Sequence, residues 1–160
     1  DIRPEELPIT ESTVLRPVNP YAVTKVAQDL IGYVYHRSYG MNIIRTRAFN
    51  HEGPRRDNVF GLSWYAYQIA RIEAGKQKPI LETGHTGDKR NFTHIQDMVN
   101  AYYLAMEKAV PGELYLIGSD ETSHICTFKE ALDFMIKLSM AKNIKIKVNQ
   151  KYVRQPHCHS

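Results

Sequence analysis

The sequence predicts an α/β fold, because segments with helical periodicity alternate with short segments rich in β-forming residues. Apolar residues recur at helical spacing over 20–39, and a β-rich run follows at 41–49. The same alternation continues as far as residue 148. The 160 residues are 42% apolar and 24% charged, which suits one globular domain or a large part of one.

Charge and cysteine content argue against several classes of protein. The formal net charge is +4 with both signs mixed along the chain, which fits an anionic ligand such as a phosphate ester but forms no basic stripe for nucleic acid. Cys126 and Cys158 form no CxxC pair, and no secretory signal is visible. The apolar stretches are far shorter than the ~20 residues of a membrane-spanning helix. We therefore expect a soluble, cytoplasmic protein that binds neither nucleic acid nor membrane.

The chain is expected to begin as a loop that leads into a long helix. Residues 1–18 contain three prolines and little periodicity. Asn19 is a suitable cap, Pro20 suits the first helical position, and Gly40 is typical of a helix end, so a helix is predicted from Pro20 to Tyr39. Its predicted apolar face consists of Val23, Ala27, Leu30, Ile31, Val34 and Tyr35.

A polar loop is expected after the next strand. The run MNIIRTRAF at 41–49 is interpreted as a buried strand, and NHEGPRRDN at 50–58 as the loop that it enters. In α/β proteins, functional sites lie where strands enter such loops. The loop is therefore a candidate site.

Three helices and four short strands are expected in the remainder of the chain. Thr127 and Glu130 form a capping-box pattern, in which each side chain satisfies a free amide at a helix start. The helices are predicted at 60–74, 96–108 and 128–140, and the strands at 79–83, 91–95, 113–118 and 144–148.

Tyr21 and Lys25 form a candidate catalytic pair at the start of the predicted helix. Residues four apart project from one helix face, and an adjacent ammonium stabilises a phenolate. Tyr21 could then take a proton from a substrate hydroxyl while hydride leaves the same carbon for a nicotinamide ring. With ten tyrosines and 21 Lys plus Arg, such a pair also arises by chance, as Tyr33 with Arg37 shows. An ordinary helix surface remains the alternative.

Several segments together resemble the extended short-chain dehydrogenase/reductase family of NAD-dependent epimerases and dehydratases. PITESTVLRPVNPYAVTK is similar to the segment that holds the family's YxxxK, and IIRTRAFNHEGPRR to the strand and loop that follow it. KRNFTHIQDMVNAYYLAMEK is similar to a later Arg-Asp-Phe/Trp segment and helix, and KVNQKYVR to a late substrate-contacting stretch. FNHEGPRR favours the GDP-mannose 4,6-dehydratases, with GDP-4-keto-6-deoxymannose reductases or other nucleotide-sugar epimerases as alternatives.

The resemblance implies NAD or NADP as cofactor, a nucleotide sugar such as GDP-mannose as substrate, and a homo-oligomer of two or four chains. It also implies roles for individual residues. These are Tyr21 as catalytic base, Lys25 as its partner and a cofactor ligand, His51 and Arg56 as cofactor contacts, and Asn50, Arg90 and Arg154 as substrate contacts.

Each of these residues also has a structural interpretation. His51 could be a loop histidine held by a backbone hydrogen bond, and Asn50 could cap a turn. Arg55 and Arg56 could form a solvated pair, whereas Arg suits forked recognition of phosphate. Arg90 could pair with a nearby aspartate, either Asp88 or Asp97.

The chain also departs from the family pattern. Trp64 stands where dehydratases carry a lysine, and residues 154–157 read Arg-Gln-Pro-His instead of Arg-Pro-Thr-Glu. The first change weakens the expected recognition of phosphate, and the second removes a carboxylate expected to contact guanine. His157, Cys158 and His159 are adjacent in an unpatterned tail, so no metal site is expected there.

The resemblance further implies a C-terminal part of an extended Rossmann-type enzyme together with its small α/β substrate-binding region. Residues 1–50 would end the dinucleotide-binding domain, and 51–160 would be mainly substrate-binding region, interleaved with returning Rossmann elements. No glycine-rich dinucleotide motif occurs in the 160 residues. We expect the chain alone to be inactive, and a non-catalytic fragment that binds a nucleotide sugar or dimerises is the alternative of another class.

Overall fold

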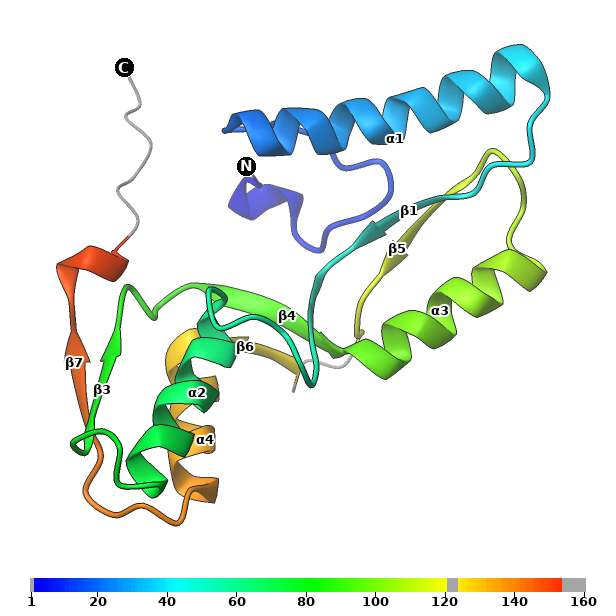
Figure 1. The fold of residues 1–160 in the computed structure, drawn as a ribbon. Helices are drawn as coiled ribbons and strands as arrows, with labels where there is room; N and C mark the ends of the chain where they lie inside the picture. The colour runs from blue at the N-terminus through cyan, green and yellow to red at the C-terminus, as the bar shows by residue number, and fades with distance from the viewer. Residues whose placement is uncertain (1, 121–123, 154–160) are drawn as a thin grey trace. The chain divides into compact units, whose positions relative to one another are not determined.

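The computed structural model describes residues 2–120 and 124–153 and confirms the predicted α/β class. The chain divides into two compact units, of which the first contains residues 1–49 and 95–118 and the second contains residues 50–94 and 119–160. Each unit combines helices with short strands (Figure 1). The division of the chain into a dinucleotide-binding part and a substrate-binding part stays a prediction.

The first unit is built around a two-stranded parallel sheet. Strands β1 and β5 pair in register from Arg45 with Leu114 to Ala48 with Ile117. Met98 of α3 and Ile117 are buried, so the packed part of this unit is small. The elements are the 3-10 turn Pro4–Glu6, α1 (Pro20–Tyr39), β1 (Arg45–Ala48), α3 (Ile95–Lys108) and β5 (Leu114–Ile117).

Helix α1 begins and ends at the predicted residues. The Asn19 side chain accepts a hydrogen bond from the Ala22 amide at 2.8 Å, which satisfies one of the free amides at the helix start. Gly40 follows Tyr39 with a left-handed φ of 67°, and its amide donates to the last carbonyls of the helix. The Asn19 cap fixes the first helical turn, which carries Tyr21.

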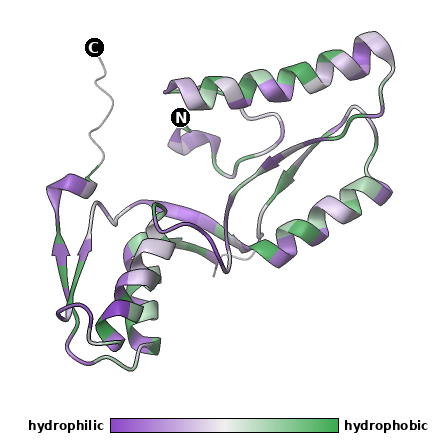
Figure 2. Cartoon of the chain, in the orientation of Figure 1, coloured by the Kyte–Doolittle hydropathy of each residue, from purple (hydrophilic) through white to green (hydrophobic). Residues whose placement is uncertain are grey.

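The predicted apolar face of α1 is exposed. Figure 2 shows apolar residues along the helix, and those predicted to form this face lie in solvent in the described structure, among them Leu30 at 52% and Ile31 at 55% exposure. The partly buried side of the helix is instead the row Ala22, Val26, Asp29, Gly32 and His36. Asp29 is held there by Arg45 and Arg47 of β1, at 3.2 and 2.6 Å. The strand itself is half-buried rather than buried and covers only four of the predicted nine residues.

The second unit contains a mixed sheet, a parallel strand pair and two helices that pack on each other. Strand β4 pairs in parallel with β2 and antiparallel with β6, and β3 pairs in parallel with β7. The elements are β2 (Asn50–Glu52), α2 (Gly61–Glu73), β3 (Ile80–Thr83), β4 (Lys89–His94), β6 (Ile125–Thr127), α4 (Phe128–Leu138), β7 (Lys145–Val148) and a 3-10 turn at Gln150–Tyr152.

The core of this unit lies between α2, α4 and β3. It is formed by the buried side chains of Tyr65, Ile69, Leu81 and Leu132. Gln68 of α2 is buried and forms hydrogen bonds with the backbone of Glu82 in β3. Its amide donates to the Glu82 carbonyl and accepts from the Glu82 amide, both at 2.8 Å, so the backbone polar groups of this edge are satisfied.

Several predicted elements are confirmed, and others are corrected. The capping box of α4 is present, with the Glu130 amide donating to the Thr127 hydroxyl at 3.0 Å and the Glu130 carboxylate accepting from the Thr127 amide. The predicted polar loop 50–58 begins instead as strand β2, because its first three residues pair with β4. Strand β4 also starts two residues earlier than predicted, so Arg90 lies within a strand rather than in a turn. Strand β6 was not predicted.

No helix within the described ranges is long and apolar enough to cross a membrane.

Candidate functional site

Tyr21 and Lys25 lie together on the exposed first turns of α1. The Lys25 ammonium is 5.6 Å from the centroid of the Tyr21 ring, which confirms that the two side chains share one face of the helix. Tyr21 is 71% exposed, and Lys25 Nζ also donates to Gln28 Oε1 at 3.3 Å. The ammonium lies against the ring face, so a cation is available near the phenol. The pair is therefore accessible to a ligand.

The polar loop places three of the predicted contacts within one short segment. Asn50 and His51 are on β2, where Asn50 is exposed and His51 is half-buried. Arg56 folds back over the segment, and its Nη1 donates to the His51 carbonyl at 2.5 Å. Its guanidinium also lies 3.9 Å from the centroid of the Phe60 ring. Arg56 is therefore held in a defined position and is not the solvated side chain of the structural alternative.

Glu52 completes this arrangement and was not singled out in the sequence. Its Oε2 is 3.3 Å from Arg56 Nε, an ion pair between residues four apart. Burial raises the pKa of the Glu52 carboxyl above its ordinary value, although Arg56 and His51 act in the opposite direction. The sequence carries no local signal for this pair, because residues four apart are neighbours on a helix whereas Glu52 ends a strand.

Arg90 lies on β4, the strand next to β2, and makes local contacts. Its Nη2 is 3.2 Å from Asp88 Oδ2, and its Nη1 donates to the Lys89 carbonyl at 2.7 Å. The predicted structural pairing with Asp88 is therefore confirmed. It does not exclude a ligand, because the pair is half-exposed and a surface ion pair of this kind is weak.

The remaining predictions concern residues outside the described ranges. Arg154 lies there, as do His157, Cys158 and His159. In the described part of the chain, Tyr21 and Lys25 belong to the first unit, whereas Asn50, His51, Arg56 and Arg90 belong to the second. The candidate site is thus described as two groups of residues.

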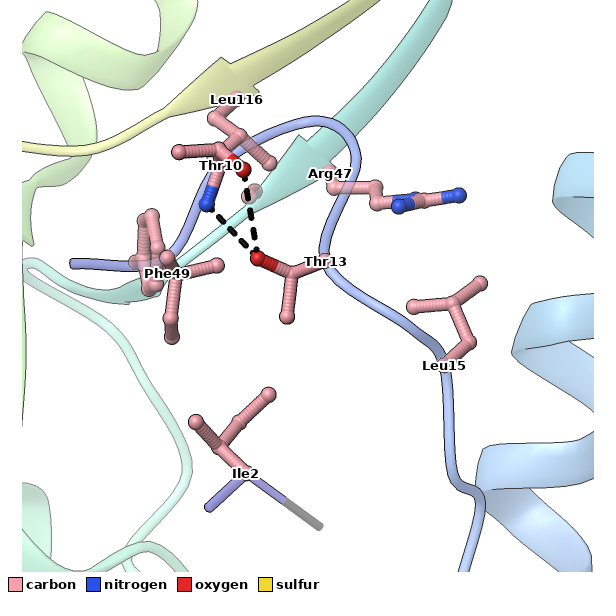
Figure 3. Close-up of a pocket in the computed structure, with 9 residues that line it drawn as sticks. Ile2, Thr10, Thr13, Leu15, Arg47, Phe49 and Leu116 are labelled. Atoms are coloured by element: carbon pink, nitrogen blue, oxygen red, sulfur yellow. Dashed lines mark hydrogen bonds between the residues drawn. The ribbon is translucent and has the colours of Figure 1, made fainter. Parts of the chain in front are cut away.

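Each unit has a hollow, and none of the predicted site residues within the described ranges lines either of them. The first unit has an apolar hollow of about 100 Å³ between the N-terminal segment and the strand pair, with Arg47 and Thr13 at its edge (Figure 3). The second unit has an open hollow of about 320 Å³ beside α2 and β3, with Trp64 and Tyr152 at its wall. Their rings are 5.7 Å apart, and Trp64 Nε1 donates to the Glu82 carbonyl at 3.1 Å. Trp64, which stands where a lysine was expected, therefore binds the backbone of β3 through its indole nitrogen.

Known proteins match the chain over nearly its full length. The family model described as GDP-mannose 4,6 dehydratase matches residues 3–159. A GDP-6-deoxy-D-mannose reductase of Pseudomonas aeruginosa is 33% identical over 126 residues, covering 79% of this chain and 41% of that protein. A GDP-mannose 4,6 dehydratase of Dictyostelium discoideum is 30% identical over 165 residues, covering 94% and 46%. The chain spans less than half the length of these relatives.

Solved structures define the class of protein. The structure of RMD from Pseudomonas aeruginosa complexed with NADPH is similar with a TM-score of 0.86 and 28% identity, over 92% of this chain and 48% of that one. A dTDP-glucose 4,6-dehydratase from Bacillus anthracis in complex with NAD has a TM-score of 0.72 and 26% identity, over 88% and 43%. The fold is therefore that of the extended, Rossmann-type short-chain dehydratases and epimerases. Within that class, the chain belongs to the GDP-mannose 4,6 dehydratase family.

Proposed function

We propose that the protein is a cytoplasmic nucleotide-sugar 4,6-dehydratase that acts on GDP-mannose with bound NADP or NAD. The observation that carries this proposal is the Tyr21 and Lys25 pair, which is exposed on a capped helix end in a chain of this family. Relatives that act on GDP-mannose and neighbours that bind NADPH or NAD support it. We also propose a homo-oligomer, as the family resemblance implies.

The residues present fit a nicotinamide cofactor at two places. Lys25 offers an exposed ammonium to a ribose hydroxyl beside Tyr21, and Arg56 offers a fixed guanidinium to a phosphate. Thr93 Oγ1, on the strand beside His51, is a buried polar atom with no hydrogen bond to any part of the chain that the structure describes. Such atoms are commonly satisfied by a ligand or by water. When bound, the nicotinamide ring supplies the hydride acceptor.

The chain's own residues account for the proton transfer. Tyr21 Oη would take the proton from the C4 hydroxyl of the sugar, and the nearby Lys25 ammonium would stabilise the phenolate that this step requires. Asn50 and Arg90 would contact the substrate phosphates, and Arg154 the nucleotide. The exposure of Tyr21 leaves room for a substrate to reach it.

A 4-keto reductase is the second candidate. The Pseudomonas aeruginosa reductase is 33% identical to the chain, and the structure of RMD has a TM-score of 0.86. The same Tyr21 and Lys25 would serve a reductase. Product analysis separates the two reactions, because only the dehydratase releases water from GDP-mannose. A non-catalytic nucleotide-sugar-binding or dimerising fragment is the alternative for the 160-residue chain by itself.

The test is the substitution Tyr21→Phe in the full natural protein. Removal of one hydroxyl should lower the turnover of GDP-mannose by at least about 100-fold, because a general acid–base group contributes roughly 10²- to 10⁴-fold. Binding of GDP-mannose, measured by calorimetry, should change little. Tyr33→Phe is the matched control, since Tyr33 lies on the same helix four residues before Arg37. Retention of turnover in Tyr21→Phe would remove Tyr21 from the mechanism.

A further inference from the structure

Arg56 is held by three groups of its own segment. Its Nη1 donates to the His51 carbonyl at 2.5 Å, its Nε lies 3.3 Å from the Glu52 carboxylate, and the guanidinium covers the Phe60 ring at 3.9 Å. Side chains of arginine usually lose considerable rotamer freedom when they bind a ligand. Here much of that freedom is already lost before any ligand arrives. The second terminal nitrogen, Nη2, makes no hydrogen bond within residues 2–120 and 124–153.

Glu52 is the anionic member of this arrangement and pairs with Arg56. Its side chain is only 21% exposed, and burial raises its pKa, which means that the folded environment disfavours the carboxylate. The charged or titratable groups that face it are Arg56 and His51 on its own segment and His94, which is its register partner on β4. A partly buried carboxylate placed 3.3 Å from an arginine of the candidate site is suited to holding that arginine in one orientation.

We propose that Glu52 is a positioning residue, whose carboxylate fixes the Arg56 guanidinium so that Nη2 is presented to a phosphate group of the nicotinamide cofactor. The inference rests on the proposed function, since it takes the cofactor as the ligand of Arg56. It goes further because it states that Glu52 and Phe60 hold the Arg56 guanidinium in its orientation. Glu52 itself does not touch the ligand, because its carboxylate would repel a phosphate.

The test is Glu52→Gln in the full natural protein, which keeps the size of the side chain and removes its charge. We expect the dissociation constant for NADPH or NADH, measured by fluorescence titration, to rise about three- to tenfold, because neighbouring groups of this kind couple appreciably. The thermal midpoint at pH 7 should stay the same or rise, because a carboxylate with a raised pKa is removed. If Glu52 had only a structural role, the substitution would lower both the affinity for the cofactor and the thermal midpoint.

Two further variants isolate the path through Arg56. In an Arg56→Ala background, Glu52→Gln should cause no additional loss of affinity. Glu73→Gln is the matched control, because Glu73 also accepts hydrogen bonds, but from Ser139 Oγ at 2.6 Å and the Met140 amide at 2.8 Å instead of from an arginine. It should leave cofactor affinity unchanged.

The outcomes distinguish this inference from the proposed function. If the wild-type protein binds neither cofactor, the proposed function fails. If the wild type binds and Glu52→Gln binds equally well, or if Glu52→Gln weakens binding equally in the Arg56→Ala background, the positioning role is wrong while the proposed function stands. A fall in the thermal midpoint together with affinity would assign Glu52 a structural role only.

Discussion

At the scale of single residues, an ion pair between Glu6 and Arg16 joins two parts of the N-terminal segment. The Glu6 carboxylate accepts two hydrogen bonds from Arg16, both at 2.7 Å, and one from the Arg3 amide at 2.9 Å. These bonds lower the pKa of Glu6 to about 2. A lowered carboxyl pKa means that its contribution to stability is present above the ordinary value of 4.5 and is lost as the pH falls toward 2.

Arg16→Gln should therefore raise the pKa of Glu6 toward 4.5, because the largest cause of the shift is removed. An NMR titration of the Glu6 side-chain carboxyl measures this directly. Arg37→Gln, on α1, is a control that should leave the Glu6 pKa unchanged. A Glu6 pKa that stays near 2 in Arg16→Gln would show that Arg16 is not the cause of the shift, and a wild-type pKa near 4.5 would show that the pair does not persist in solution.

At the scale of elements, the ends of α1 depend on backbone conformation as well as on side chains. Gly40 has a φ of 67°, and a Cβ built there would meet nothing within 4 Å. The cost of Gly40→Ala is therefore purely conformational, and we expect a loss of about 1 kcal/mol in the free energy of unfolding. Denaturant titration measures it.

Gly32→Ala is the matched control for this prediction, because Gly32 lies inside the same helix. A Cβ there would make an ordinary contact with Ile43 Cγ2 at 3.4 Å. Alanine is the better helix former, so a gain of about 0.5 kcal/mol is expected. Equal effects of the two substitutions would contradict the assignment of Gly40 as a left-handed helix end.

Helices were predicted better than strands, and the reason is physical. The limits of α1 and the start of α4 follow from Asn19, Gly40 and the capping box of Thr127, which are local signals. Strands β2 and β6 have three residues each and exist because they pair with β4. Pairing is a contact between distant segments, so no pattern within the polar loop or before α4 could predict it.

In the candidate site too, local features could be predicted from the sequence and contacts made by chain reversal could not. Spacing alone placed Tyr21 and Lys25 on one face, because positions four apart on a helix are neighbours. The contacts of Arg56 could not be predicted, since they require the chain to fold back at Arg55, whose φ is 69°. A positive φ at a residue other than glycine is set by its surroundings and not by its own preference.

At the scale of the whole molecule, the chain exposes more apolar surface on its helices than a small globular protein usually does. On α1, Val23, Leu30, Ile31, Val34 and Tyr35 are each about half exposed, and α3 adds exposed Val99, Tyr102, Tyr103 and Met106. The apolar residues that the sequence groups on one face of α1 are therefore exposed, and a different row of the helix faces β1. Large exposed apolar patches are typical of surfaces that associate.

The 160-residue chain produced by itself should therefore self-associate, with an apparent mass that rises with concentration in light scattering. Leu30→Glu combined with Val34→Lys should reduce that association, because the pair removes apolar area while a glutamate four residues before a lysine supports the helix. Thr24→Glu with Gln28→Lys adds the same charges on α1 without removing apolar area, and it should have little effect. A wild-type chain that stays monomeric at every concentration would show that these residues are covered in solution.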